Sequence, residues 1–207
     1  MNHDLTRYTA AGVRDTMRPG DVIAFAGTRP ISRLIGIFAG SNLSHVGMVK
    51  TVSEDGMFRV MITQSTIDHG ESGAQSTYLS DMLLTYPGRA WWCPLSEEVR
   101  ALIDWPKFRA FIAASEGHVT YDTPGLFGFL ARGLPIVGPR ICQSENAKAM
   151  FCSGYDSAIL EAAGVLRGIN TSQVSPRQLL AMDLYVAGKQ PVQLIGEAGS
   201  FSPYNSL

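Results

Sequence analysis

Two apolar segments joined by a turn-forming tetrapeptide constrain the fold of this chain more than any other feature. Ser44–Lys50 and Met57–Gln64 each have the length and composition of a β-strand, and Ser53–Gly56, with the sequence SEDG, lies between them. Ser, Asp and Gly in such a position are typical of a turn between paired strands. We therefore expect an antiparallel β-hairpin.

The register of this hairpin decides whether two polar side chains meet. A turn centred on the bond between Glu54 and Asp55 places His45 directly opposite Gln64. Directly opposed residues have Cβ atoms about 4.5–5.5 Å apart, so the amide could hold the imidazole in one orientation. A slip of one residue would send the two side chains to opposite faces. The other interpretation of His45 is a half-buried histidine bonded to a backbone carbonyl.

A cysteine lies at the expected start of an apolar-faced helix in Met150–Gly164, which has the sequence MFCSGYDSAILEAAG. Helical spacings of three and four connect Cys152 to Tyr155, Ile159 and either Ala162 or Ala163, so the thiol is expected on the inward stripe. Unpaired N–H groups and the positive end of the helix dipole favour the thiolate, which is the nucleophilic form. Cys152 is therefore the candidate nucleophile.

Two other interpretations of Cys152 stay open. Free cysteines are among the most buried residue types, and most of them pack as small apolar groups. Alternatively, Ser144 caps a helix that starts earlier, which places Cys152 in mid-helix and removes the dipole effect. The other two cysteines carry no comparable pattern: Cys93 is expected to pack beside a proline, and Cys142 has no assigned role.

Composition excludes several classes of function. The 207 residues, 45% of them hydrophobic, support one domain with a sizeable core. Seventeen basic and eighteen acidic residues, without a Lys or Arg run, argue against nucleic acid as a partner. The cysteines do not fit a zinc motif, and His3, His69 and His118 lack ligand spacing, so neither a metal nor a cofactor is expected.

The N-terminal residues mix charges throughout and contain no continuous apolar stretch of signal-peptide length, and no apolar run in the chain approaches the length of a membrane-spanning helix. We therefore expect a chain without a transmembrane segment that is cytoplasmic as synthesised. Action in the periplasm or outside the cell would need another delivery route.

Further elements are expected along a single domain that spans residues 1–207. Residues 1–17 form an N-terminal extension with a possible short helix, and residues 197–207 form a polar tail. Strands are expected at 21–25, 90–94 and 191–195; helices at 31–38, at 96–117 with a break at Trp105-Pro106, and at 175–184; and a long loop with a short helix near Ser80 at 67–88.

The glycine-rich apolar segment at residues 125–138 permits two interpretations. It is either a core helix followed by a loop, or a semi-exposed wall for an acyl substrate or a partner surface. If the chain docks into a larger assembly, this segment and the C-terminal tail are the expected contacts.

Five motifs in this order resemble the permuted NlpC/P60 superfamily, specifically its YiiX/YaeF-like branch. They are RPGDVIAF from Arg18, SHVGMV from Ser44, the strand ending at Gln64, the pair Tyr121-Asp122, and FCSGYDSAIL from Phe151. The resemblance implies an α+β, circularly permuted papain-like fold in which an antiparallel sheet packs against helices that include the cysteine helix. In this branch the histidine strand precedes the cysteine helix.

The resemblance also implies roles for four residues. Cys152 is the nucleophile, His45 the base, Gln64 the residue that orients the ring, and Tyr121 a further hydrogen-bond donor near the site. The branch often has glutamate where this chain has Gln64. A neutral amide orients an imidazole but stabilises its charged form less than a carboxylate does, so a less activated cysteine is expected.

Three functions follow from this scaffold. The first is a cysteine hydrolase that acts through a thioester on an amide bond, in a peptidoglycan stem peptide or a related peptide. The second is an acyltransferase or lipid ester hydrolase that uses the apolar segment. The third is a non-enzymatic binding or structural module that retains the papain-like shell.

Overall fold

The computed structural model describes residues 3–10, 12–29, 41–54, 57–66, 72–119, 152–187 and 191–197. Several sequence-based predictions lie outside the described residues. They are the helix at 31–38, Tyr121, the apolar segment at 125–138, Cys142, Ser144 and the C-terminal tail beyond residue 197.

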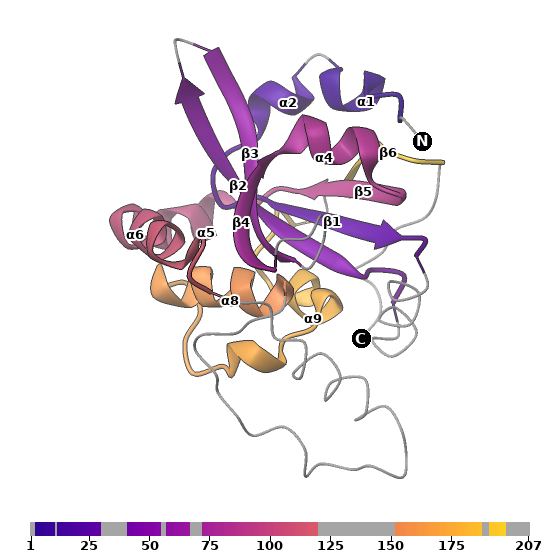
Figure 1. Ribbon diagram of the computed structural model, residues 1–207. Helices are drawn as coiled ribbons and strands as arrows, with labels where there is room; N and C mark the ends of the chain where they lie inside the picture. Colours follow the sequence, from indigo (N-terminus) through magenta and orange to yellow (C-terminus); the bar gives the residue numbers. More distant parts are fainter. Residues whose placement is uncertain are drawn as a thin grey trace, which may run out of the picture.

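The described chain is an α+β fold built on one antiparallel sheet (Figure 1). The strand order is β4-β3-β2-β1-β5-β6, and every neighbouring pair is antiparallel. The strands are β1 (Val22–Gly27), β2 (His45–Glu54), β3 (Met57–Thr66), β4 (Gly73–Tyr78), β5 (Gly88–Cys93) and β6 (Val192–Ile195).

Helices cover both faces of this sheet (Figure 1). One face carries α1 (Thr6–Thr9), α2 (Val13–Thr16) and α4 (Leu79–Thr85). The other carries α5 (Glu97–Leu102), α6 (Trp105–Ser115), α8 (Cys152–Ala162) and α9 (Pro176–Ala181), with the short 3₁₀ helix η1 (Thr171–Gln173) between the last two.

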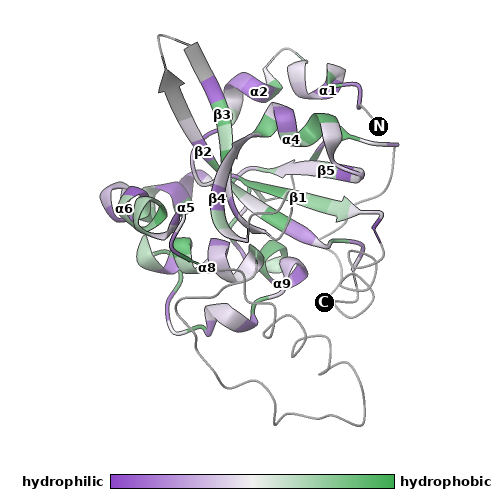
Figure 2. Cartoon of the chain, in the orientation of Figure 1, coloured by the Kyte–Doolittle hydropathy of each residue, from purple (hydrophilic) through white to green (hydrophobic). Residues whose placement is uncertain are grey.

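The core has two parts, one on each face of the sheet, and the central strand β1 contributes to both. Val22 and Ala24 belong to the cluster beneath α8, whereas Ile23 and Phe25 belong to the cluster beneath α4. All four are fully buried. A strand covered on both faces has a continuous apolar sequence, which explains the run VIAF, and β1 is green along most of its length in Figure 2.

Three sequence-based predictions were wrong in detail. The expected loop at 67–88 contains strand β4, whose polar sequence GAQSTY concealed its pairing with β3. The break in the region 96–117 falls at Ile103-Asp104, because Asp104 caps α6 and Pro106 occupies its first turn. Helix α9 ends at Ala181 rather than near residue 184.

The β2–β3 hairpin is antiparallel as predicted, but its register is different. Glu54 pairs with Met57, and the ladder continues to Met48 and Thr63. The pairing is therefore centred one residue later than expected, which moves every cross-strand partner by two residues. Because side chains in a strand alternate with a period of two, this shift keeps the expected faces.

A buried ion pair fastens the start of β1 to the other side of the domain. The carboxylate of Asp21 accepts hydrogen bonds from Trp92 Nε1 and from the backbone N–H groups of Arg18 and Leu95, each at 2.9 Å. It also pairs with the guanidinium of Arg100 on α5. Burial raises the pKa of Asp21, and Arg100 opposes this shift. Asp21 therefore joins β1, β5 and α5 at one point.

Candidate functional site

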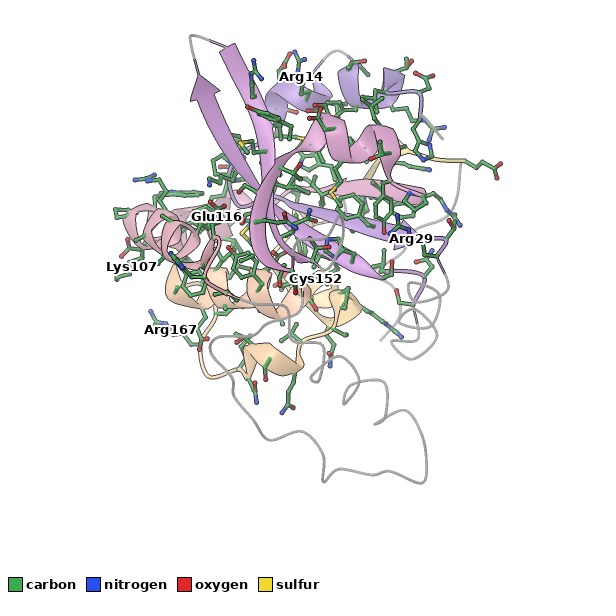
Figure 3. All side chains as sticks on the ribbon, in the orientation of Figure 1. Arg14, Arg29, Lys107, Glu116, Cys152 and Arg167 are labelled. Carbon is green, nitrogen blue, oxygen red and sulfur yellow. The ribbon has the colours of Figure 1, made fainter. Side chains whose placement is uncertain are left out.

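Cys152 is buried at the described start of α8, and Figure 3 shows it between this helix and the sheet. Its residue is only 4% exposed, and it shares one apolar cluster with Tyr155, Ile159 and Ala163. This is the inward stripe predicted from the spacing, with Ala163 rather than Ala162 as its last member. Gly154 permits close packing here, since a Cβ on it would lie 3.1 Å from the carbonyl oxygen of Thr171.

Burial raises the pKa of the Cys152 thiol, although several hydrogen bonds oppose this effect. The opposing donors include the backbone N–H groups of Val46, Ser153 and Cys152 itself. They lower the pKa because they favour the charged sulfur. The free protein therefore holds a thiol rather than a ready thiolate, and the same donors are available to stabilise negative charge on the sulfur.

His45 and Gln64 meet, as the hairpin predicted. The imidazole Nε2 and the amide Oε1 lie 2.6 Å apart. An amide oxygen only accepts, so this contact assigns the ring proton to Nε2 and makes Nδ1 the basic nitrogen. The pair is diagonal instead of directly opposed, and Gly47 lies beside Gln64, where a Cβ would come within 3.4 Å of the Gln64 Cβ. The missing side chain leaves room for the amide to reach His45.

The imidazole of His45 packs against the apolar cluster beneath α4. Its centroid lies 5.6 Å from that of Phe25, which in turn lies 4.8 Å from the ring of Tyr86. Cys152 belongs to the apolar cluster beneath α8. Its sulfur interacts with the backbone N–H of Val46, the next residue after His45. Among the described residues, no hydrogen bond joins the sulfur to the imidazole. Adjacent residues of a strand point to opposite faces, so the imidazole lies on the α4 side of β2 and the sulfur on the α8 side. Direct proton transfer requires a rearrangement that brings the two together.

A third ionisable group lies in this region, and the sequence analysis missed it. Asp156 follows Cys152 by one helical turn, is fully buried, and has no hydrogen-bond partner for either carboxyl oxygen within the described chain. Burial raises its pKa well above the ordinary value, the charge of Cys152 raises it further, and His45 lowers it. The i, i+4 spacing from Cys152 was the available signal, but an aspartate is normally expected on the exposed face of a helix.

Gln64 also lines a cavity of about 330 Å³ between α4 and the edge of the sheet. The wall combines apolar surface with polar groups: amides and hydroxyls from β3 and β4, a carboxylate from α4 and one guanidinium. The lining residues are Arg29, Gln64, Thr66, Gln75, Thr77, Asp81, Met82, Thr85, Tyr86 and Pro87. Such a lining suits a ligand with several hydrogen-bonding groups.

A buried hydroxyl chain fixes α8 against the sheet. The Tyr155 hydroxyl lies 3.1 Å from Thr63 Oγ1 on β3 and 2.8 Å from Ser115 Oγ on α6. Thr63 also donates to Glu116, whose carboxylate pairs with Lys50 at 2.8 Å. These contacts set the position of the helix, and with it the position of Cys152.

The remaining predictions concern residues outside this group. Cys93 is fully buried, and burial strongly raises the pKa of its thiol, as expected for a packing residue. In the described ranges, no three His, Cys, Asp or Glu side chains gather as a metal site would require. Nor does any described helix have the length and hydropathy to cross a membrane.

No protein-family model and no curated protein matches the chain. One solved structure with a similar arrangement is described as the crystal structure of metalloprotein yiiX from Escherichia coli O157:H7, DUF1105. It is 14% identical, with 86% of this chain and 88% of that chain covered, and the TM-score is 0.48. At this level the similarity carries no inference about activity or ligands.

Proposed function

We propose that this protein is a cysteine hydrolase with a permuted papain-like (NlpC/P60) fold that cleaves an amide bond in a peptide. The observation that supports the proposal is that the Cys152 sulfur and the His45–Gln64 pair lie at adjacent residues of β2, although on opposite faces of that strand. The sulfur of Cys152 lies at the N–H of Val46, and the neighbouring His45 is held by Gln64 at 2.6 Å. A nucleophile, a base and an orienting group are the parts that acyl transfer to a thiol requires.

The reaction follows from these parts. After a rearrangement at the start of β2 brings the imidazole to the sulfur, Nδ1 of His45 takes the proton of Cys152, and the thiolate attacks the carbonyl carbon. The C–N bond then breaks as the imidazolium returns a proton to the leaving amine, which leaves a thioester on Cys152. Water, deprotonated by His45, hydrolyses the thioester. Backbone N–H groups at the start of α8 are positioned to stabilise the oxyanion, as those of Cys152 and Ser153 already favour charge on the sulfur.

The polar cavity beside Gln64 supports a peptide in preference to a long acyl chain. Amide and hydroxyl groups in its wall match the repeated donors and acceptors of a peptide, such as a peptidoglycan stem. Acyl transfer to or from a lipid is the second candidate for the same thiol, and it depends on the apolar segment at 125–138. The buried thiol favours the third candidate, a non-enzymatic module, unless substrate or motion exposes it.

A trapping experiment tests the proposal. The wild-type protein is incubated separately with muropeptides and with phospholipid vesicles, and both released products and the mass of the Cys152 peptide are followed by mass spectrometry. We expect muropeptide cleavage and an acyl adduct on Cys152, both absent in Cys152→Ala. If only the phospholipid is turned over, the lipid reaction replaces amide cleavage as the function of this site. No turnover and no adduct with either substrate would leave the non-enzymatic module.

Gln64→Glu is expected to make Cys152 more reactive. A carboxylate beside His45 stabilises the imidazolium, and an opposite charge at this distance shifts an ionisation by one unit or more, which corresponds to about a tenfold change. The rate of Cys152 alkylation by iodoacetamide near pH 6.5 should therefore rise about tenfold. Gln75→Glu is the matched control, because Gln75 pairs with Gln64 across β3 and β4 and lines the same cavity. Equal rates in all three proteins would contradict the role given to Gln64.

A further inference from the structure

The carboxyl group of Asp156 has no explanation in the packing of α8. The side chain is completely buried, and both oxygens lack a hydrogen-bond partner in the described part of the chain. An isolated carboxylate in an apolar interior is strongly unfavourable, and it is usually paired or holds a proton. Two other buried polar groups of this helix are satisfied, since Ser153 donates to the carbonyl of Val174 at 2.6 Å and Tyr155 is bonded on two sides; the uncharged Ser157 hydroxyl is not.

The position of Asp156 relative to Cys152 gives the group a chemical context. Residues four apart in a helix lie one above the other on the same face. Both side chains are buried against the sheet, where the dielectric is low and charges act strongly on each other. Two acids that share such a place do not both ionise readily, because the second negative charge is opposed by the first.

Of the other ionisable groups around α8 in the described chain, some are paired elsewhere and only two act on Asp156. From β2, His45 acts on Asp156 as a positive charge, whereas Lys50 is paired with Glu116 from the end of α6. On the helix itself, the Tyr155 hydroxyl is bonded to Thr63 and Ser115, and Glu161 is exposed. η1 has no titratable side chain, and α9 carries only Arg177. The groups that act on Asp156 are therefore Cys152 and His45.

We propose that Cys152 and Asp156 form a coupled acid pair that holds a single negative charge, with the proton on Asp156 whenever the Cys152 sulfur is a thiolate. The proposal rests on the role given to Cys152 in the proposed function. With the proton on Asp156, the thiolate and the imidazolium of His45 have no net charge in their buried surroundings. If Asp156 also ionised, it would oppose the thiolate and compete for the positive charge of His45.

Asp156 is therefore a positioning residue that sets the pH range in which Cys152 is nucleophilic. The test is the rate of Cys152 alkylation by iodoacetamide from pH 5 to 10, resolved by mass spectrometry, in wild type, Asp156→Asn and Ser157→Ala. Asparagine has the shape of protonated aspartate and stays neutral at every pH. We expect a broad rise in the wild type, because charge on Asp156 opposes the thiolate, and a single titration in Asp156→Asn with about tenfold faster alkylation at pH 8.

Ser157→Ala is the matched control, since Ser157 is the next residue, is equally buried, and has an unpartnered hydroxyl without charge. Its profile should overlay that of the wild type. Identical profiles for Asp156→Asn and wild type would overturn the proposal. So would alkylation that is more than tenfold slower in Asp156→Asn at all pH values, because the carboxylate would then be needed as a charge rather than as an acid.

Thermal unfolding gives a readout that does not depend on thiol chemistry. Because the pKa of Asp156 in the folded state lies above its ordinary value of 3.8, its favourable contribution is complete below that pH and is lost as the pH rises. The melting temperature of Asp156→Asn minus that of the wild type should therefore increase from pH 5 to pH 8. A constant difference across this range would overturn the proposal even if the alkylation profiles differed.

The two proposals fail separately. Coupled alkylation profiles without turnover of any substrate would remove the hydrolase and leave the acid pair. Peptide turnover with uncoupled profiles would remove the acid pair and leave the hydrolase.

Discussion

His45→Ala is expected to slow the alkylation of Cys152 near pH 7 by a factor of about 10² to 10⁴, the usual contribution of a positioned general base. Burial raises the pKa of the Cys152 thiol, so near pH 7 a base is needed to generate the thiolate. His45 is the candidate base, because it precedes the residue whose N–H acts on the sulfur. The rate is measured by mass spectrometry of the Cys152 peptide after timed exposure to iodoacetamide.

Two comparisons make this result specific. His118→Ala removes an exposed histidine in the turn that follows α6 and should leave the rate unchanged. At high pH the alkylation rate of His45→Ala should approach that of the wild type, because hydroxide then removes the thiol proton. A rate near pH 7 that is equal in His45→Ala and wild type would mean that thiol and imidazole act independently, and the hydrolase proposal would fail.

Asp21→Ala is expected to destabilise the folded protein by about 3–5 kcal/mol, the usual cost of removing one partner of a buried ion pair. The change leaves the charge of Arg100 uncompensated and leaves Trp92 Nε1 and the N–H of Leu95 without their acceptor. In a chain of this length such a loss lowers the melting temperature on the order of 10 °C. Urea unfolding followed by circular dichroism measures the difference in free energy.

The exposed pair of Arg18 and Glu97 provides the control, because it joins the same two parts of the chain at the surface. Glu97→Gln should leave the unfolding midpoint nearly unchanged, since solvent screens such pairs. Loss of stability that is equal in Asp21→Ala and Glu97→Gln would show that burial contributes nothing to the Asp21 interaction.

Local sequence patterns were sufficient for much of the sheet and for two of the candidate residues. The apolar run after Asp21 and the SEDG segment at the end of β2 specified strands because strands that are neighbours in sequence are also partners in structure. His45 and Gln64 meet although the register was wrong by two residues, since that error preserves the face of each side chain. Strand β4 was missed because its polar residues line a cavity instead of the core.

The sequence by itself determined several strands of the sheet, the apolar stripe of the cysteine helix and the contact between His45 and Gln64, because each depends on periodicity or on a short turn. Only the tertiary structure decided that the Cys152 thiol is buried beside Val46, that Asp156 is enclosed with it, and that Asp21 joins three distant elements. These facts depend on how helices from the second half of the chain pack on strands from the first. Charge and burial at such contacts come from residues far apart in sequence, which no local pattern records.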